Sequence, residues 1–206
     1  TLIETLNLWE SPTPLHVLTN GRAFSDSEFT SSISTALENR EVQWGIPLYS
    51  FKQELHDELV GAQGAFLETL EGLMNASAQG FDIELRIVMV KQNFQDLPTF
   101  LQFIATHLPS VGRVSVMQLE PKGWARKNFD ALYVSPIEQS QYLDKALRIA
   151  DLRGVSIELF NYPRCLLSEK SRTHAVKSIS DWKNYFPEIC NSCEERQDCG
   201  GLFTSA

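Results

Sequence analysis

The four cysteines of this 206-residue chain are the residues best suited to chemistry. Cys190 and Cys193 are separated by two residues and Cys199 follows after five more, which gives the spacing C-x2-C-x5-C. Two intervening residues let both thiolates of the first pair reach one metal centre from a tight turn. Cys165, earlier in the chain, can supply the fourth thiolate. The pattern predicts a single metal site near the C-terminus.

The identity of the metal stays open at this point, because four thiolates suit a tetrahedral zinc ion as well as a [4Fe–4S] cluster. Gly200 and Gly201 follow the last cysteine, where they allow the backbone to bend around a cluster and to present N–H groups to sulfur. A mixed Cys–His zinc site that includes His174 is an alternative. Disulfides are a weaker interpretation, since they form in oxidising compartments.

The composition sets limits on the partners. With 43% apolar and 21% charged residues, the chain is typical of a globular protein. The net charge of −8 argues against a nucleic-acid partner, which needs clustered Lys and Arg. No apolar run approaches the roughly 20 residues that span a bilayer, so we expect a cytoplasmic protein without a membrane partner. The chain opens without Met inside a helical apolar pattern, and we expect a fragment of a longer protein.

Short apolar runs predict the strands that must position the cysteines. Runs without a polar face suit strands buried on both sides, as in a parallel sheet. They lie at residues 15–18, 44–49, 83–90, 113–119 and 155–160.

Helical spacing of apolar residues fills the gaps between these runs. The expected helices are 26–39 with Ser25 as N-cap, 66–74 extending toward Gly80, 97–107, and 136–152 between Ser135 and Gly154. Strands that alternate with helices indicate βα units. Residues 1–160 are therefore predicted to form part of an α/β barrel or a doubly wound sheet, with mostly parallel strands.

The pattern changes in the cysteine tail, defined as residues 161–206. It holds every cysteine and one expected helix, from about residue 172 to 185. The tail is too short and too polar to bury a core of its own, so we expect a metal to hold it together. Trp124 and Trp182 are expected to pack the tail on the barrel.

Several stretches match a known pattern in order. They are HVLTNG at 16–21, Ser50 with HD at 56–57 and GAF at 64–66, ELRIV at 84–88 with Asn93, and the C-x2-C-x5-C tail. Together they resemble a radical-SAM enzyme with an auxiliary-cluster tail of the SPASM or twitch kind. Stretches 120–125, 175–184 and 199–203 are similar to the C-type radical-SAM maturase of the His-Xaa-Ser system.

The resemblance implies a partial (βα) barrel followed by an auxiliary [4Fe–4S] cluster on the four cysteines. It also implies S-adenosylmethionine and a peptide or small-protein substrate at the carboxyl ends of the strands, where barrel ligands gather. Residues expected there are Thr19, Asn20, Ser50, Arg86, Asn93 and Glu120. For each of them, capping a strand or bonding a loop is the alternative. Asp57 is expected to cap a helix, and His16 to be a satisfied core histidine.

One departure from the family is large, because the C-x3-C-x2-C motif that holds the SAM-cleaving cluster is absent. We expect that motif upstream in the full protein and expect these residues to be inactive alone. The alternatives are a non-catalytic zinc-stapled binding module and a glycyl-radical activating enzyme. Loss of the first strands would expose a sheet edge near residues 15–18, prone to dimer formation or to capping by the N-terminal helix.

Overall fold

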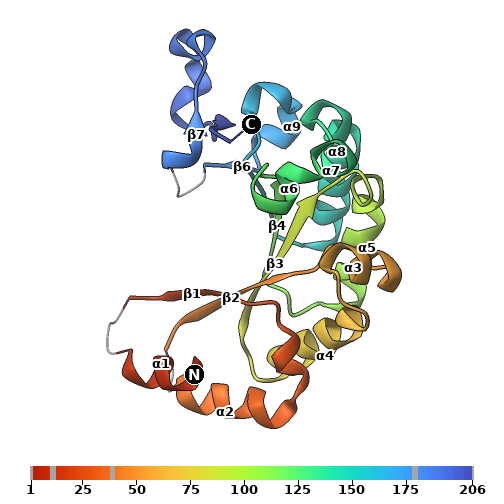
Figure 1. Ribbon diagram of the computed structural model, residues 1–206, viewed down its shortest axis with the longest axis vertical. Coiled ribbons are helices and arrows are strands. Elements are labelled where there is room, and N and C mark those ends of the chain that lie inside the picture. Colours follow the sequence, from red (N-terminus) through yellow and green to blue (C-terminus); the bar gives the residue numbers. More distant parts are fainter. Residues whose placement is uncertain (1, 10–12, 38–39, 178–180, 206) are drawn as a thin grey trace. The chain divides into compact units, whose positions relative to one another are not determined.

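The computed structural model describes residues 2–9, 13–37, 40–177 and 181–205 of an α/β protein (Figure 1). Six strands follow in the order β1-β2-β3-β4-β5-β6, and the pairs β1–β2, β2–β3, β4–β5 and β5–β6 are parallel. β1 is the edge strand at one end of this order. The described chain forms two compact units, one of residues 1–86 and 106–113 and one of residues 87–105 and 114–206.

The first unit places helices against one face of its strands. Trp44, Ile46, Ile83 and Leu85 are fully buried, and the Trp44 ring lies 5.1 Å from that of Phe24. The elements are α1 (Leu2–Leu8), β1 (Leu15–Leu18), the 3₁₀ helix η1 (Arg22–Ser25), α2 (Ser27–Leu37), β2 (Val42–Pro47), α3 (Gln53–Val60), α4 (Ala65–Ala78) and β3 (Asp82–Met89), whose last residues belong to the second unit.

The turn after β1 lies in close backbone contact with α4. A Cβ added to Gly72 of α4 would lie 2.2 Å from the carbonyl oxygen of Gly21, so only glycine fits there. The turn after β1 is therefore held by helix packing as well as by its own hydrogen bonds.

The strands of the first unit also carry charged residues. Glu84 is 3% exposed, and its Oε2 lies 2.6 Å from Nε2 of His16 and 3.7 Å from Nη1 of Arg86. The side chain of His16 is 42% exposed. The expectation of a core histidine is wrong, because His16 points away from the packed helices and is paired with Glu84.

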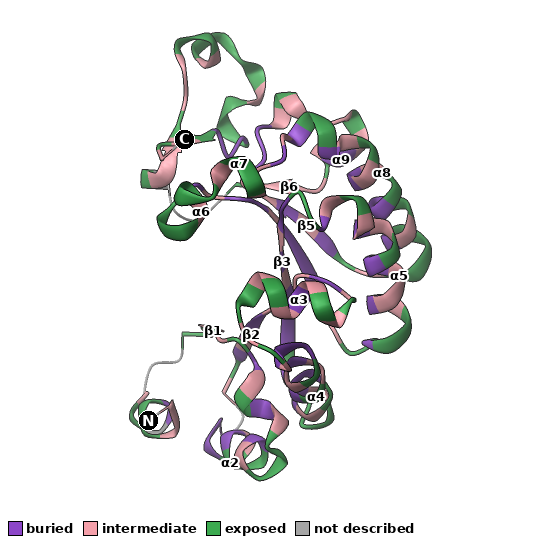
Figure 2. Cartoon of the chain, turned by 45° about the vertical axis from the view of Figure 1, so that its right-hand side comes forward, coloured by how far each residue is buried: buried purple, intermediate pink, exposed green. Residues whose placement is uncertain are grey.

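The second unit continues the alternation and ends in short elements. Figure 2 shows that α8 carries buried and exposed residues along its length, while the segments near the C-terminus are mostly exposed. The elements are η2 (Phe94–Asp96), α5 (Leu97–His107), β4 (Arg113–Gln118), α6 (Gly123–Lys127), α7 (Phe129–Leu132), α8 (Pro136–Arg153), β5 (Ile157–Phe160), η3 (Arg164–Leu166), α9 (Glu169–Arg172), β6 (Ala175–Val176), η4 (Asp181–Lys183), β7 (Asn184–Tyr185), η5 (Glu188–Ser192), η6 (Glu194–Gln197) and β8 (Leu202–Phe203).

Most predicted elements of residues 1–160 are confirmed within a few residues. α5 has the predicted bounds, and α8 begins with a capping box at Ser135 and ends at Gly154 in the left-handed conformation. The N-cap prediction for Ser25 is wrong. Ser25 ends η1, and its hydroxyl donates to the carbonyl of Arg22. The Asp26 carboxylate accepts the N–H groups of Glu28 and Phe29 instead.

The helix predicted over residues 172–185 is also wrong. α9 ends at Arg172, and β6 pairs with β5 through Leu159 and Ala175. Residues 178–180 of the predicted helix lie outside the described residues. The backbone of β6 pairs with the neighbouring strand β5, whereas a helix would form its hydrogen bonds within its own segment. This long-range pairing determines the conformation.

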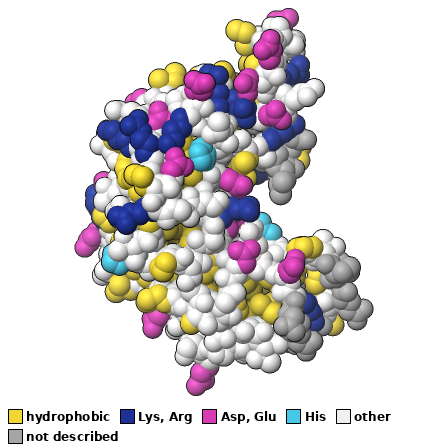
Figure 3. Space-filling view, turned by 180° about the vertical axis from the view of Figure 1, so that it is seen from behind, with side chains coloured by type: hydrophobic (Ala, Val, Ile, Leu, Met, Phe, Trp, Pro, Cys, Tyr) yellow, Lys and Arg dark blue, Asp and Glu magenta, His cyan; other side chains and the backbone are white. Residues whose placement is uncertain are grey.

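Two surface properties bear on the predicted partners. On the face drawn in Figure 3, Lys and Arg side chains lie among Asp and Glu side chains. Across the described ranges, we find no helix with the length and apolar character required to cross a membrane.

Candidate metal centre

Cys165 is positioned by the segment that follows β5. Asn161 adopts a left-handed conformation with φ 64°, which turns the chain out of the strand. The next residue, Tyr162, is 1% exposed and its hydroxyl donates to Oε1 of Gln139 at 2.5 Å. The Gln139 amide in turn donates to Oε1 of Gln118 at 2.6 Å. A buried network therefore anchors the chain three residues before Cys165.

The other three cysteines lie in the loop between β7 and β8. The two strands pair antiparallel, with Asn184 opposite Phe203 and Tyr185 opposite Leu202. Inside the loop, Cys193 N–H donates to the Cys190 carbonyl at 3.3 Å, so the C-x2-C segment forms a tight turn. The hairpin thus brings the beginning and the end of the loop together.

All four cysteines line one cavity of about 190 Å³. Cys165 and Cys193 are exposed, Cys190 is half-buried and Cys199 is buried. The remaining wall is mainly apolar and includes Pro163, Leu166, Phe186, Pro187, Ile189 and Leu202. Cys165 and the C-x2-C-x5-C cysteines therefore line the same cavity, and the metal site on all four stays a prediction.

The sulfur atoms of the cavity have polar and electrostatic neighbours. Sγ of Cys199 accepts the backbone N–H groups of Arg164 and Gly201, each at 3.4 Å. Burial raises the pKa of the Cys165 thiol, and the nearby Cys199, Cys190 and Cys193 raise it further. Without a bound cation, Cys165 therefore keeps its proton to a higher pH than an ordinary cysteine.

Gly201 is the glycine that this geometry requires. It has φ +65°, and an added Cβ would lie 2.9 Å from the Tyr185 carbonyl oxygen. At Gly200 the nearest heavy atom would be 3.8 Å away. Of the two glycines predicted to bend around a cluster, Gly201 presents its N–H to sulfur and has no room for a side chain.

An ion pair joins the two cysteine-bearing segments. Nε of Arg164, next to Cys165, lies 2.5 Å from Oε2 of Glu195, which stands between Cys193 and Cys199. The Arg164 carbonyl accepts Nε–H of Arg172 at 3.0 Å. Sequence reasoning missed this pair, because nothing in the sequence links positions 31 residues apart.

The thiols share a cavity but do not converge on one ion. Among the described residues, no group of three or more His, Cys, Asp or Glu side chains is placed to hold a single metal ion. His174 does not line the cavity, and its Nδ1 lies 3.2 Å from the Ile157 carbonyl oxygen. The mixed Cys–His site is therefore not assembled.

The residues predicted to bind cofactor in the first unit make local hydrogen bonds. Thr19 Oγ1 accepts Gly21 N–H at 3.3 Å, Asn20 Oδ1 accepts Arg22 N–H at 3.2 Å, and Ser50 Oγ accepts Lys52 N–H at 2.9 Å. Arg86 contacts Glu84 on β3. Asn20 also lines a cavity at the strand ends, of about 390 Å³.

Asn93 and Glu120, the two residues of the second unit predicted to bind cofactor, form contacts with different parts of the chain. Asn93 accepts Val90 N–H at 2.8 Å and donates to the Val88 carbonyl at 2.9 Å, which closes the loop after β3. Glu120 lies 3.1 Å from both the Lys122 and Lys183 ammonium groups. Burial opposes its ionisation, but the two lysines outweigh burial and leave the pKa of Glu120 below its ordinary value.

The tryptophans expected to anchor the tail are exposed. Trp124 is 77% and Trp182 72% exposed, so the packing prediction is wrong. Their rings instead carry lysine ammonium groups, Lys127 at 4.8 Å from the Trp124 centroid and Lys122 at 4.9 Å from that of Trp182. These contacts leave the rings facing solvent.

The HD stretch has a structural role, as predicted for Asp57. From α3 its carboxylate accepts Gly64 N–H at 2.7 Å and Phe66 N–H at 2.8 Å at the start of α4. The Phe66 bond lowers the pKa of Asp57 most, burial works against it, and the Gly64 bond lowers it further. The carboxylate thus caps the next helix.

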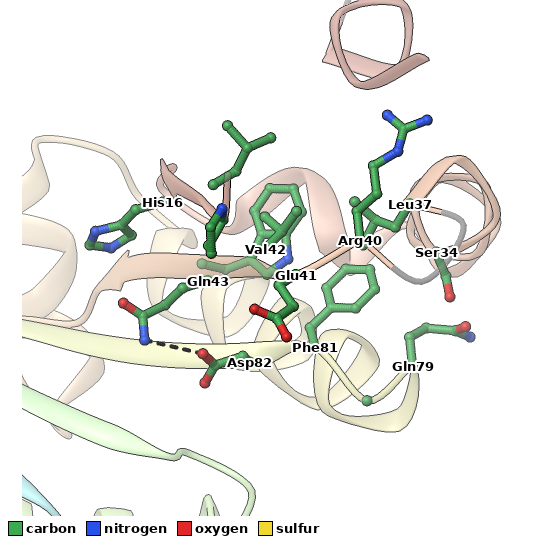
Figure 4. A pocket seen from close by; sticks show the side chains of 14 residues that line it. His16, Ser34, Leu37, Arg40, Glu41, Val42, Gln43, Gln79, Phe81 and Asp82 are labelled. Carbon is green, nitrogen blue, oxygen red and sulfur yellow. Dashed lines mark hydrogen bonds between the residues drawn. The ribbon is translucent and has the colours of Figure 1, made fainter. Parts of the chain in front are cut away.

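Another cavity of the first unit, about 610 Å³, lies at the amino ends of β1, β2 and β3 (Figure 4). Arg40, Glu41 and Gln43 line it, and Gln43 donates to Asp82 at 3.1 Å. Ligands of α/β sheets gather at the opposite, carboxyl ends of strands. Its size alone does not make it a site.

The fold and this geometry define an α/β protein with a cavity lined by four cysteines. No protein-family model matches the chain, and no curated protein matches its sequence.

Proposed function

We propose that the four cysteines bind an auxiliary [4Fe–4S] cluster. The observation that carries the proposal is that Cys165, Cys190, Cys193 and Cys199 all line one cavity of about 190 Å³. Two backbone N–H groups directed at Cys199 Sγ add support, because such bonds are typical around cluster sulfurs and tune their potential.

The resemblance of the C-x2-C-x5-C tail to an auxiliary-cluster tail favours a cluster over one zinc ion. Zinc–sulfur bonds of about 2.3 Å place four thiolates close together around a single zinc. A cluster holds its irons apart with inorganic sulfides, so its thiolates stand further apart around a larger volume. The four thiols line a shared cavity. The zinc-stapled module is therefore the weaker proposal.

We propose further that the chain is the C-terminal portion of a radical-SAM maturase of peptides or small proteins, with a partial barrel. The parallel βα order and the strand-end stretches that resemble the family support this. The 206 residues contain no C-x3-C-x2-C motif, so in this proposal the SAM-cleaving cluster is held elsewhere in the protein. S-adenosylmethionine and substrate would bind at the strand ends near Arg86.

The experiment that tests the activity uses the full-length gene product, purified without oxygen. With S-adenosylmethionine and dithionite, the proposal predicts formation of 5′-deoxyadenosine. The control replaces the cysteines of the C-x3-C-x2-C motif by alanine, which should abolish the product. A full-length sequence without that motif, or no 5′-deoxyadenosine from iron-loaded protein, would count against a radical-SAM enzyme and leave a cluster-binding module.

A further inference from the structure

The cavity of about 390 Å³ in the first unit, called here the His56 cavity, is built at the carboxyl ends of β1 and β2. The turn after β1 contributes Asn20 and Arg22, the segment after β2 contributes Tyr49, and α3 and α4 contribute His56 and Thr69. Its volume lies in the range of about 300–1,000 Å³ typical of small-molecule sites. All of its lining residues belong to one compact unit.

His56 presents a hydrogen-bond donor at this cavity. The residue is 2% exposed, and its Nδ1 accepts the backbone N–H of Tyr49 at 3.2 Å. A backbone N–H can only donate, so Nδ1 carries no proton and the neutral ring carries it on Nε2. Burial lowers the pKa of His56, Asp57 opposes this, and Arg22 lowers the pKa further. Nε2–H has no partner among the described residues.

Thr69 adds a second buried polar group to the same wall. It is 1% exposed and sits inside α4, where a threonine hydroxyl commonly bonds the carbonyl one turn earlier. In the described part of the chain its hydroxyl has no hydrogen-bond partner. Both His56 and Thr69 line the cavity, so a ligand bound there can accept a hydrogen bond from each of them.

Arg22 supplies positive charge. Its Nε donates to Oε2 of Glu68 at 2.5 Å, and its side chain is 35% exposed. Within the described ranges, the terminal guanidinium nitrogens have no protein partner. Arg22 and His56 line the same cavity. The cavity therefore combines hydrogen-bond donors and a cation with an apolar wall, which is formed by Leu59, Val60 and Ala65.

We propose that the His56 cavity binds a small carboxylic acid with an apolar body. Nε2–H of His56, the Thr69 hydroxyl and the Arg22 guanidinium address the carboxylate, and the aliphatic wall covers the hydrocarbon part. An anion matches the donors because hydrogen bonds to charged groups are the stronger ones. The site depends on the first unit alone and is independent of the cluster proposal.

The test compares sodium isovalerate with isovaleramide, which has the same shape and no charge, by calorimetry and NMR titration of the 206-residue chain. We expect saturable binding of isovalerate and at least tenfold weaker binding of the amide. Thr69→Val keeps the side-chain shape and removes the hydroxyl, and it should weaken isovalerate binding about tenfold. Arg22→Gln should remove the preference for the anion.

Thr35→Val is the matched control, because Thr35 is exposed on α2 and its hydroxyl bonds Ser31 of the same helix. It should bind isovalerate as the unchanged chain does. Circular dichroism of every variant separates loss of binding from loss of fold. Equal binding of acid and amide, unchanged binding in folded Thr69→Val and Arg22→Gln, or no saturable binding of either compound would overturn the proposal and leave a water-filled cavity.

Discussion

The cavity of the cysteine tail and the His56 cavity are built in opposite ways. The first is framed by short turns and a two-residue hairpin, and its wall includes Ile189, 82% exposed, and Leu202, 40% exposed. The second rests on α3 and α4, and its residues His56 and Ala65 are 2% and 1% exposed. We expect a cavity of the first kind to depend on a bound group for its order, and a cavity of the second kind to be maintained by packing.

The largest expected effect follows from removing the bound group. Chelation of iron, or Cys199→Ser, should raise amide hydrogen exchange throughout residues 181–205, because metal binding and folding are coupled in such segments. Exchange in α4, which lines the His56 cavity, should not change. Equal protection of the tail with and without iron would show that its turns need no bound group.

Gly201→Ala tests the backbone of the tail in the same comparison. An alanine at φ +65°, with its Cβ 2.9 Å from the Tyr185 carbonyl oxygen, should lower the free energy of unfolding by about 1–3 kcal/mol. It should also weaken the binding of the cluster. Gly200→Ala is the control, since its Cβ would meet nothing nearer than 3.8 Å. The two variants are compared by their iron content after gel filtration. Equal iron retention in both would contradict the requirement for glycine at position 201.

Tyr162→Phe probes the anchor between the strands and the tail. The change leaves the Gln139 acceptor buried without its 2.5 Å donor, and we expect a loss of about 1–3 kcal/mol in the free energy of unfolding. Urea denaturation measures it. The exposed Tyr185→Phe serves as control and should be nearly neutral. A neutral Tyr162→Phe would mean that the tail is held by its own contacts alone.

The smallest expected effect is on the pH dependence of stability, in the unit that contains the His56 cavity. Asp57 has a lowered pKa in the folded protein, so the stability it contributes is present above its unfolded pKa and is lost as pH falls through the folded value. Asp57→Asn should lower the melting temperature at neutral pH and reduce the difference between neutral and acidic pH. Exposed Asp130→Asn is the control. An unchanged acid profile in Asp57→Asn would remove the capping role.

Local signals in the sequence predicted the first 160 residues well and the tail poorly. The Ser135 capping box and Gly154 lie within a few residues of the helix ends that they determine, so α8 could be found from sequence alone. The helix expected from residue 172 fails because β6 is defined by its pairing with β5. Conformation there depends on contacts between distant positions.

The same distinction applies to the sites. The close spacing of Cys190, Cys193 and Cys199 limits how far apart their thiols can lie, and all three line one cavity. Cys165 lines the same cavity, although its sequence position does not require this. The Arg164–Glu195 pair and the tautomer of His56 could not be found, since each depends on a partner that only tertiary structure brings near. Ser50 and Asn93 match the family pattern, yet their hydrogen bonds are those of loop residues.

The central claim is tested most directly by reconstituting the 206-residue chain with ⁵⁷Fe and sulfide without oxygen, followed by iron analysis and Mössbauer spectroscopy. The account predicts about four irons and four sulfides per chain, in the spectrum of a [4Fe–4S] cluster. Changing any of the four cysteines to serine should lower that content. Stoichiometric zinc without iron uptake, or full iron content in the Cys165→Ser variant, would contradict a cluster bound by all four cysteines.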